Sequence, residues 1–100
     1  GTGGEVTNVA PSANAGGDVT ITQPALATLV GQVSDDGQPV GSTLVVQWSQ
    51  VLGPANAEFT APVAATTAVR FPLAGTYRFR LSVSDGVLAD TDDVIVTVRA

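Results

Sequence analysis

The sequence predicts an all-β protein whose strands form a sandwich of two sheets, and two observations support this fold class. First, residues 75–86 read GTYRFRLSVSDG, in which apolar and polar side chains alternate before an Asp-Gly turn. Because successive side chains of a strand point to opposite faces of a sheet, the alternation predicts one long, half-buried strand. Second, Gly, Pro and Asp-Gly turn signals interrupt the chain at short intervals, and no segment shows helical periodicity of useful length. Short strands separated in this way are typical of sandwiches and barrels.

The turn signals divide the chain into seven or eight expected strands. The segments between the turns are rich in Val, Thr, Leu and Phe, which are residues that fit a pleated, half-buried surface. The expected strands lie near residues 7–14, 18–22, 26–33, 43–52, 56–60, 66–73, 76–84 and 88–98.

The alternation of side chains along each expected strand predicts which residues form the core, because every second residue faces the same side. Gly31 has no side chain and would let another residue, such as Trp48, approach the backbone closely. Tyr77 opens its strand after a Gly-Thr turn, where its hydroxyl can reach back to a turn backbone, as in a tyrosine corner. The residues expected to face inward are Leu29, Gly31, Val33, Leu44, Val46, Trp48, Val69, Phe71, Leu73, Tyr77, Phe79, Leu81, Val83, Val94, Val96 and Val98.

Length and charge limit the classes of partner. One hundred residues are enough for one domain with a core. The nine acidic residues outnumber four arginines, and the net charge of -5 opposes attraction to nucleic acid or anionic lipid. No apolar run approaches the roughly 20 residues that a membrane span needs. The chain has no Met and opens on Gly-Thr-Gly-Gly, so we interpret residues 1–6 as a linker or a remnant of cloning and residues 7–100 as the domain.

The residue types that are missing argue against catalysis. The chain has no Cys, no His and no Lys. The chain therefore lacks the residues that form Ser-His-Asp triads, thiol nucleophiles, Schiff bases and the usual zinc ligand sets. The paired carboxylates at 35–36 and 92–93 lie next to each other in the sequence and have no pocket to separate their pKa values. We expect that the protein is not an enzyme.

Several motifs, taken in order and spacing, resemble a polycystic-kidney-disease (PKD) repeat over nearly the whole chain. The resemblance implies an immunoglobulin-like β-sandwich of PKD type, of the kind found in tandem in bacterial and archaeal surface proteins and in animal ectodomains. Many PKD domains carry WDFGDG after the tryptophan, whereas this chain reads WSQVLGP there and is similar to a branch with WxQVxGP. The matching motifs are NVAP at 8–11, Ala13–Gly16, SDDG at 34–37, WSQVLGP at 48–54, Phe59 with 64–67, Gly75–Tyr77 and VSDG at 83–86.

The resemblance also points to a candidate calcium site. In an immunoglobulin-like sandwich, the start of the domain and the loops after the second and sixth strands lie at one pole. Calcium binds six to eight hard oxygen ligands, and the positions that match those of calcium-binding PKD domains are Asn8, Asp35, Asp36 and Asp85, with Ser34 as an alternative ligand to Asp35. The loop is shortened to SDDG, so one acidic position of the fuller SxDxDG motif is absent. The alternative is that both Asp-Gly pairs serve only as turns, because Asp accepts hydrogen bonds from nearby amides and Gly takes positive φ.

Other polar residues are expected to be solvated. The acids at positions 90, 92 and 93 are interpreted as a solvated strand start, and protection of a sheet edge is an equally good interpretation. One sheet face is expected to be an ordinary solvated surface, with a polar binding partner as the alternative. Its residues are Val45, Gln47, Arg78, Arg80, Ile95 and Thr97.

Together, these features predict a non-catalytic structural or adhesive module of a larger secreted or cell-surface protein. Its expected partners are neighbouring domains of the same chain, with protein or glycan at the cell surface as a further option. The alternative is a protein- or carbohydrate-binding accessory domain attached to an extracellular enzyme. Sugar recognition commonly uses exposed aromatic rings. The alternation of the strands points Trp48, Phe71, Tyr77 and Phe79 inward, and the resemblance implies a core position for Phe59, so none of the five aromatic residues is left for that role.

Overall fold

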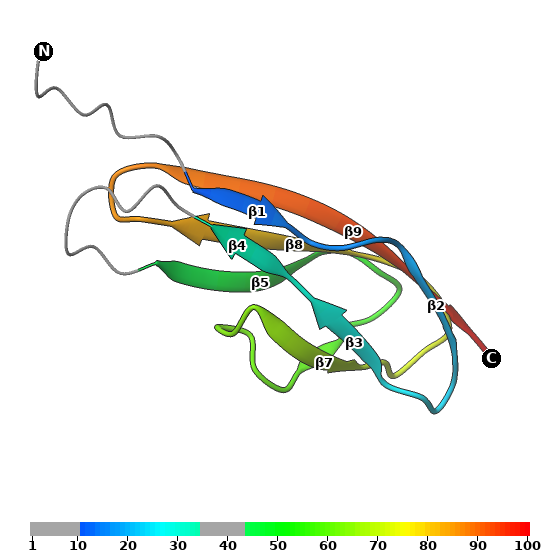
Figure 1. The fold of residues 1–100 in the computed structure, drawn as a ribbon. Coiled ribbons are helices and arrows are strands. Elements are labelled where there is room, and N and C mark those ends of the chain that lie inside the picture. The colour runs from blue at the N-terminus through cyan, green and yellow to red at the C-terminus, as the bar shows by residue number, and fades with distance from the viewer. Residues whose placement is uncertain (1–10, 35–43) are drawn as a thin grey trace, which may run out of the picture.

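A computed structural model describes residues 11–34 and 44–100 of the chain, which form an all-β immunoglobulin-like sandwich (Figure 1). All regular elements in these ranges are strands, as the alternating sequence pattern predicts. They are β1 (Ser12–Asn14), β2 (Val19–Thr22), β3 (Ala27–Val30), β4 (Gln32–Ser34), β5 (Val45–Leu52), β6 (Glu58–Phe59), β7 (Thr66–Arg70), β8 (Gly75–Ser84) and β9 (Ala89–Arg99).

The strands are arranged in three hydrogen-bonded groups. The largest has the order β2-β9-β8-β5, with β2 parallel to β9 and the other neighbours antiparallel. A second group has the order β3-β7-β6, and the pair β1-β4 forms the third. The two long strands β8 and β9 pair in register from Gly75↔Val98 to Ser84↔Ala89. This hairpin therefore runs through the whole length of the larger sheet.

The N-terminal segment crosses from one layer to the other between β1 and β2. β1 pairs with β4, whereas β2 pairs with β9 of the large sheet. The crossing begins at Gly16, whose φ is 87° and whose N–H is donated to Asn14 Oδ1 at 2.9 Å. A positive φ favours glycine, which explains the Ala13–Gly16 motif in structural terms.

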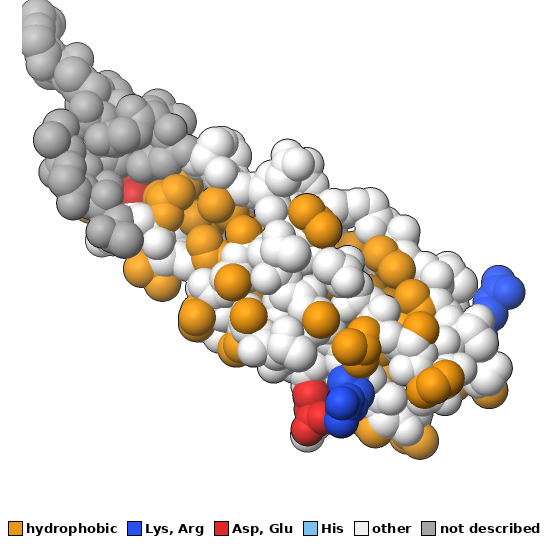
Figure 2. Space-filling model, turned by 60° about the horizontal axis from the view of Figure 1, so that its bottom comes forward, with side chains coloured by type: hydrophobic (Ala, Val, Ile, Leu, Met, Phe, Trp, Pro, Cys, Tyr) orange, Lys and Arg blue, Asp and Glu red, His pale blue; other side chains and the backbone are white. Residues whose placement is uncertain are grey.

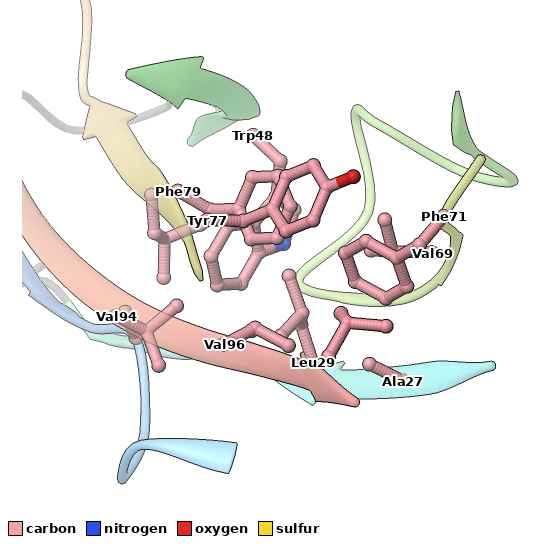
Figure 3. Packing of buried hydrophobic residues seen from close by; sticks show 12 residues of the cluster. Ala27, Leu29, Trp48, Val69, Phe71, Tyr77, Phe79, Val94 and Val96 are labelled. Carbon is pink, nitrogen blue, oxygen red and sulfur yellow. The ribbon is translucent and has the colours of Figure 1, made fainter. Parts of the chain in front are cut away.

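Most of the predicted inward residues are buried. The core cluster draws on β3, β5, β7, β8 and β9, and Figure 3 shows side chains of β3 and β9 pointing toward the rings of Trp48 and Tyr77. The aromatic rings contact one another, with centroids 4.8 Å apart for Phe71 and Tyr77 and 5.2 Å apart for Phe59 and Phe79. The two layers are therefore joined by one continuous apolar core.

Two predictions about the strands and their inward residues are wrong. The strand expected at 26–33 is interrupted at Gly31 into β3 and β4, which pair with different partners. Leu73 was expected to face inward, but it is 51% exposed, because β7 ends at Arg70 and the following residues turn toward β8. The predicted strand positions 7–10 and 43 lie outside the described residues.

The close approach predicted at Gly31 is confirmed. A Cβ built on Gly31 would lie 2.7 Å from Leu81 Cδ2, 2.8 Å from the Ala65 oxygen and 3.1 Å from Trp48 Cζ2. The Ala65 carbonyl accepts hydrogen bonds from the Gly31 N–H at 2.9 Å and from Trp48 Nε1 at 3.0 Å. The buried indole N–H is thus satisfied by the opposite layer.

The tyrosine corner is also confirmed, and it explains the WSQVLGP motif. Tyr77 donates its hydroxyl hydrogen to the Leu73 carbonyl at 2.7 Å. Gln50 fixes the loop after β5, since its Nε2 donates to Ala55 O and its Oε1 accepts from Ala57 N, both at 2.8 Å. Gly53 packs against the Tyr77 ring, where a Cβ would lie 2.5 Å from Cδ2. The WSQVLGP motif therefore holds the loop after β5 against the ring of Tyr77.

Candidate functional site

Of the four predicted calcium ligands, Asp85 lies in the described part of the chain, where it forms the β8–β9 turn. Its side chain is buried, with 3% exposed. Asp85 Oδ1 accepts the N–H groups of Val87 and Leu88, both at 2.8 Å, and Gly86 has a φ of 98°. The predicted Asp-Gly turn chemistry is confirmed at this position, and it holds the carboxylate in a fixed orientation.

The other three predicted ligands, Asn8, Asp35 and Asp36, lie outside the described residues. Residues that flank them come together at one end of the sandwich, because Ser12 pairs with Ser34 and Val45 pairs with Ser84. We call this end, together with the β8–β9 turn, the N-terminal pole; it lies on the left of Figure 1. Within residues 11–34 and 44–100, no group of three or more His, Cys, Asp or Glu side chains is placed to hold a metal ion.

The acids at the start of β9 have a structural role that the sequence pattern does not indicate. Asp90 Oδ2 accepts the Ala13 N–H at 2.9 Å, and Asp92 Oδ2 accepts the Ala15 N–H at 2.7 Å. On the side of β1 that does not pair with β4, these two carboxylates accept the N–H groups that a neighbouring strand would otherwise accept. The interpretation of Asp90 and Asp92 as a solvated strand start is therefore wrong.

Asp93 belongs to the opposite face of β9 and pairs with two arginines. Arg80 Nε lies 2.8 Å from Asp93 Oδ1, and Arg78 Nε lies 3.1 Å from Asp93 Oδ2. Hydrogen bonding from Arg80 lowers the pKa of the Asp93 carboxyl below its ordinary value, and the same bond raises the pKa of Arg80. Asp93 is therefore paired with arginines and is not surrounded by solvent alone. Both arginine side chains are 46% exposed, and they lie on the solvated face that the sequence predicts for them.

The aromatic residues offer no stacking surface for a sugar. Trp48, Phe71, Tyr77 and Phe79 are buried, as strand parity predicted, and Phe59 is partly buried against the core. All five aromatic residues of the chain lie in the described ranges. The described residues also contain no helix that is long and apolar enough to cross a membrane.

A hollow lies at the opposite end of the sandwich, and the sequence pattern gave no signal for it. It has a volume of about 600 Å³ and is lined by Gln23, Pro24, Leu26, Arg70 and Phe71. This end is also where β9 finishes, since the Gln23 N–H is donated to the Arg99 carbonyl at 2.9 Å. We call it the C-terminal pole. It could not be found from periodicity because its wall combines a turn with the end of a distant strand.

Comparison with known proteins places the chain among PKD domains. A family model described as "K319L-like, PKD domain" matches residues 15–98. The solution structure of the PKD domain of human KIAA0319 is similar, with a TM-score of 0.74 and 25% sequence identity over 99% of this chain and 89% of that one. The PKD domain of the KIAA 1837 protein has a TM-score of 0.68 and 22% identity over 95% of this chain and 92% of its own.

The fold is also similar to that of immunoglobulin domains outside this family. The titin M3 domain has a TM-score of 0.59 and 15% identity, and the match covers 90% of this chain and 97% of that one. At this identity the likeness concerns the fold alone, and it confirms the immunoglobulin-like class.

Proposed function

The chain belongs to the K319L-like PKD domain family, and from this we propose that it is a non-catalytic structural or adhesive module of a larger secreted or cell-surface protein. The observation that carries the proposal is the placement of the chain ends. The described chain begins beside β4 at the N-terminal pole and ends at the C-terminal pole (Figure 1). A module with ends at opposite poles adds its full length to a string of neighbouring domains.

The residue chemistry supports a module without catalysis. The chain has no His, Cys or Lys. Asp85, Asp90 and Asp92 accept backbone N–H groups, and Asp93 is paired with arginines. These carboxylates maintain the strand arrangement.

We further propose that calcium binds at the N-terminal pole through Asn8, Asp35, Asp36 and Asp85. Two observations support this: the Asp85 carboxylate is held in one orientation by the turn, and the described neighbours of the other three residues lie at the same pole. Carboxylate and amide oxygens are suitable calcium ligands. A bound ion would offset the repulsion between neighbouring carboxylates and stiffen the junction with a preceding domain.

Thermal unfolding in chelator and in millimolar calcium tests this site. An ion that binds only the folded state raises stability by RT ln(1 + [L]/Kd). For a domain of this size, each ~1 kcal/mol of stabilisation raises Tm by about 4–8 °C. We expect a rise of several degrees for the unmodified chain.

Two variants and a matched control make the test specific. Asp85→Asn keeps an Oδ1 that can accept the turn N–H groups, so its loss of the calcium response would reflect the missing charge. Asp36→Asn should lose the response as well. Glu58→Gln, an exposed acid on β6, should keep it. Equal losses of the calcium-dependent rise in Tm in all three variants would indicate general charge screening. If calcium does not change the Tm of the unmodified chain, the proposed site binds no calcium.

A further inference from the structure

Two carboxylates tie β1 to β9 in a fixed register. The Ala13 N–H is donated to Asp90, and the Ala15 N–H is donated to Asp92. In both bonds the two residues are 77 positions apart in the sequence. β1 and the start of β9 therefore run in the same direction and keep the same offset, although β1 pairs with β4 in the other layer.

The same offset continues through β2. Asp18, just before β2, accepts the Ile95 N–H through its Oδ1 at 3.1 Å, and the separation is again 77 positions. The parallel pairing of β2 with β9 keeps this offset in all of its residue pairs. Figure 1 shows β1, β2 and β9 running side by side toward the C-terminal pole. We call residues 13–22 the N-terminal strap.

Side chains continue the register where the two backbones do not pair. Among the described residues, β1 forms its backbone pairs with β4 and not with β9. Hydrogen bonds from an N–H group to a carboxylate are shorter and stronger than those between neutral groups, and one of the donors belongs to Ala15, which is 2% exposed. The three acids therefore extend the contact with β9 from β2 to the whole N-terminal strap.

The direction of the N-terminal strap determines how it responds to tension. The described residues form an elongated body (Figure 2), and their two chain ends lie at opposite poles. Because the strap and β9 are parallel, a pull on the two ends draws them in opposite directions along their common axis. All hydrogen bonds between them then share the load at once. A pull across the strands would instead break these bonds one after another.

We propose that the N-terminal strap and β9 form a clamp that keeps the domain folded when it is pulled by its two ends. Asp18, Asp90 and Asp92 are the side chains that hold the clamp together. This inference goes beyond the proposed function, because resistance to force is a property of the isolated domain and needs neither calcium nor a neighbouring domain.

Pulling single domains in two directions with optical tweezers, in chelator, tests the clamp. The chain has no Cys, so an introduced Cys is a unique attachment point. One arrangement pulls on the two chain ends. The other pulls on the N-terminus and on Val87→Cys in the β8–β9 turn, which lies at the same pole, so the strap separates from β9 bond by bond. At equal force, we expect the folded domain to last at least about tenfold longer in the first arrangement, the factor that one buried hydrogen bond contributes.

Alanine variants show whether the carboxylates provide the resistance. Asp92→Ala removes the acceptor of the buried Ala15 N–H and should shorten the lifetime under end-to-end pulling about tenfold. Asp90→Ala should act in the same direction. Asp93→Ala is the matched control, since Asp93 lies on the same strand but pairs with Arg80 on the opposite face.

The ratio of the lifetimes in the two pulling directions separates the clamp from stability in general. A general loss of stability shortens both lifetimes by the same factor, so the ratio should fall for Asp90→Ala and Asp92→Ala and stay unchanged for Asp93→Ala. Equal lifetimes of the unmodified domain in the two directions would overturn the proposal. So would a ratio that is the same in both strap variants as in the unmodified domain.

Discussion

Gly31 illustrates how a single residue fixes the distance between the two layers. The Ala65 carbonyl beside it is held by two hydrogen bonds, one from the Gly31 backbone and one from the Trp48 indole. Because this oxygen belongs to the backbone and has both donors in place, it cannot move aside cheaply. The residue at position 31 must therefore lack a side chain for the indole to reach its acceptor.

Replacing Gly31 by Ala should destabilise the domain by about 1–3 kcal/mol, as overpacking of a core does. The added Cβ would lie 2.8 Å from the Ala65 oxygen and 2.7 Å from Leu81 Cδ2. The matched control is Gly17→Ala, where a Cβ would meet no heavy atom within 4 Å, and its effect should stay within about 0.5 kcal/mol. Urea denaturation followed by circular dichroism measures both. Equal effects at the two glycines would contradict the close approach.

At the scale of elements, the sequence predicts what depends on periodicity and misses what depends on contacts between distant segments. The alternation around Tyr77 and Phe79 was sufficient to assign their strand and its buried face, and both residues are fully buried. The break at Gly31 and the parallel pairing of β2 with β9 could not be predicted, since both depend on which strand lies alongside. Of the candidate calcium site, the turn chemistry of Asp85 was predictable, whereas the binding of an ion stays a prediction.

The bond between Asp92 and β1 gives a prediction at the same scale. Asp92→Ala should remove the acceptor of the Ala15 N–H, which belongs to a residue with 2% exposure. A buried donor without a partner costs about 1–3 kcal/mol. We expect lower stability and faster hydrogen exchange at the Ala15 amide, measured by NMR. Glu58→Ala, at the other end of the molecule, serves as the control. Unchanged exchange at Ala15 would mean that the carboxylate does not hold β1 in place.

For the whole molecule, cooperativity follows from the way the layers share one core. Each sheet has an apolar face that must be covered by another element. Leu29 of the β3-β7-β6 sheet belongs to the same cluster as Val96 and Tyr77 of the large sheet. Trp48 joins the layers by polar bonds too, since its backbone N–H is donated to Pro62 O at 2.7 Å and its indole to Ala65 O. Neither layer has a core of its own to remain folded alone.

Unfolding in urea should therefore occur in one transition when it is followed by two independent probes. Trp48 is the only tryptophan, and because it is 1% exposed between the layers, its fluorescence reports their separation. Far-ultraviolet circular dichroism reports the strands themselves. We expect the two curves to coincide, with a common slope of about 1–3 kcal/mol per molar urea. Measurement in chelator removes any contribution from calcium. If fluorescence changes at a lower urea concentration than circular dichroism, the layers separate while the strands persist. That result would contradict the view that the shared core makes the domain a single folding unit.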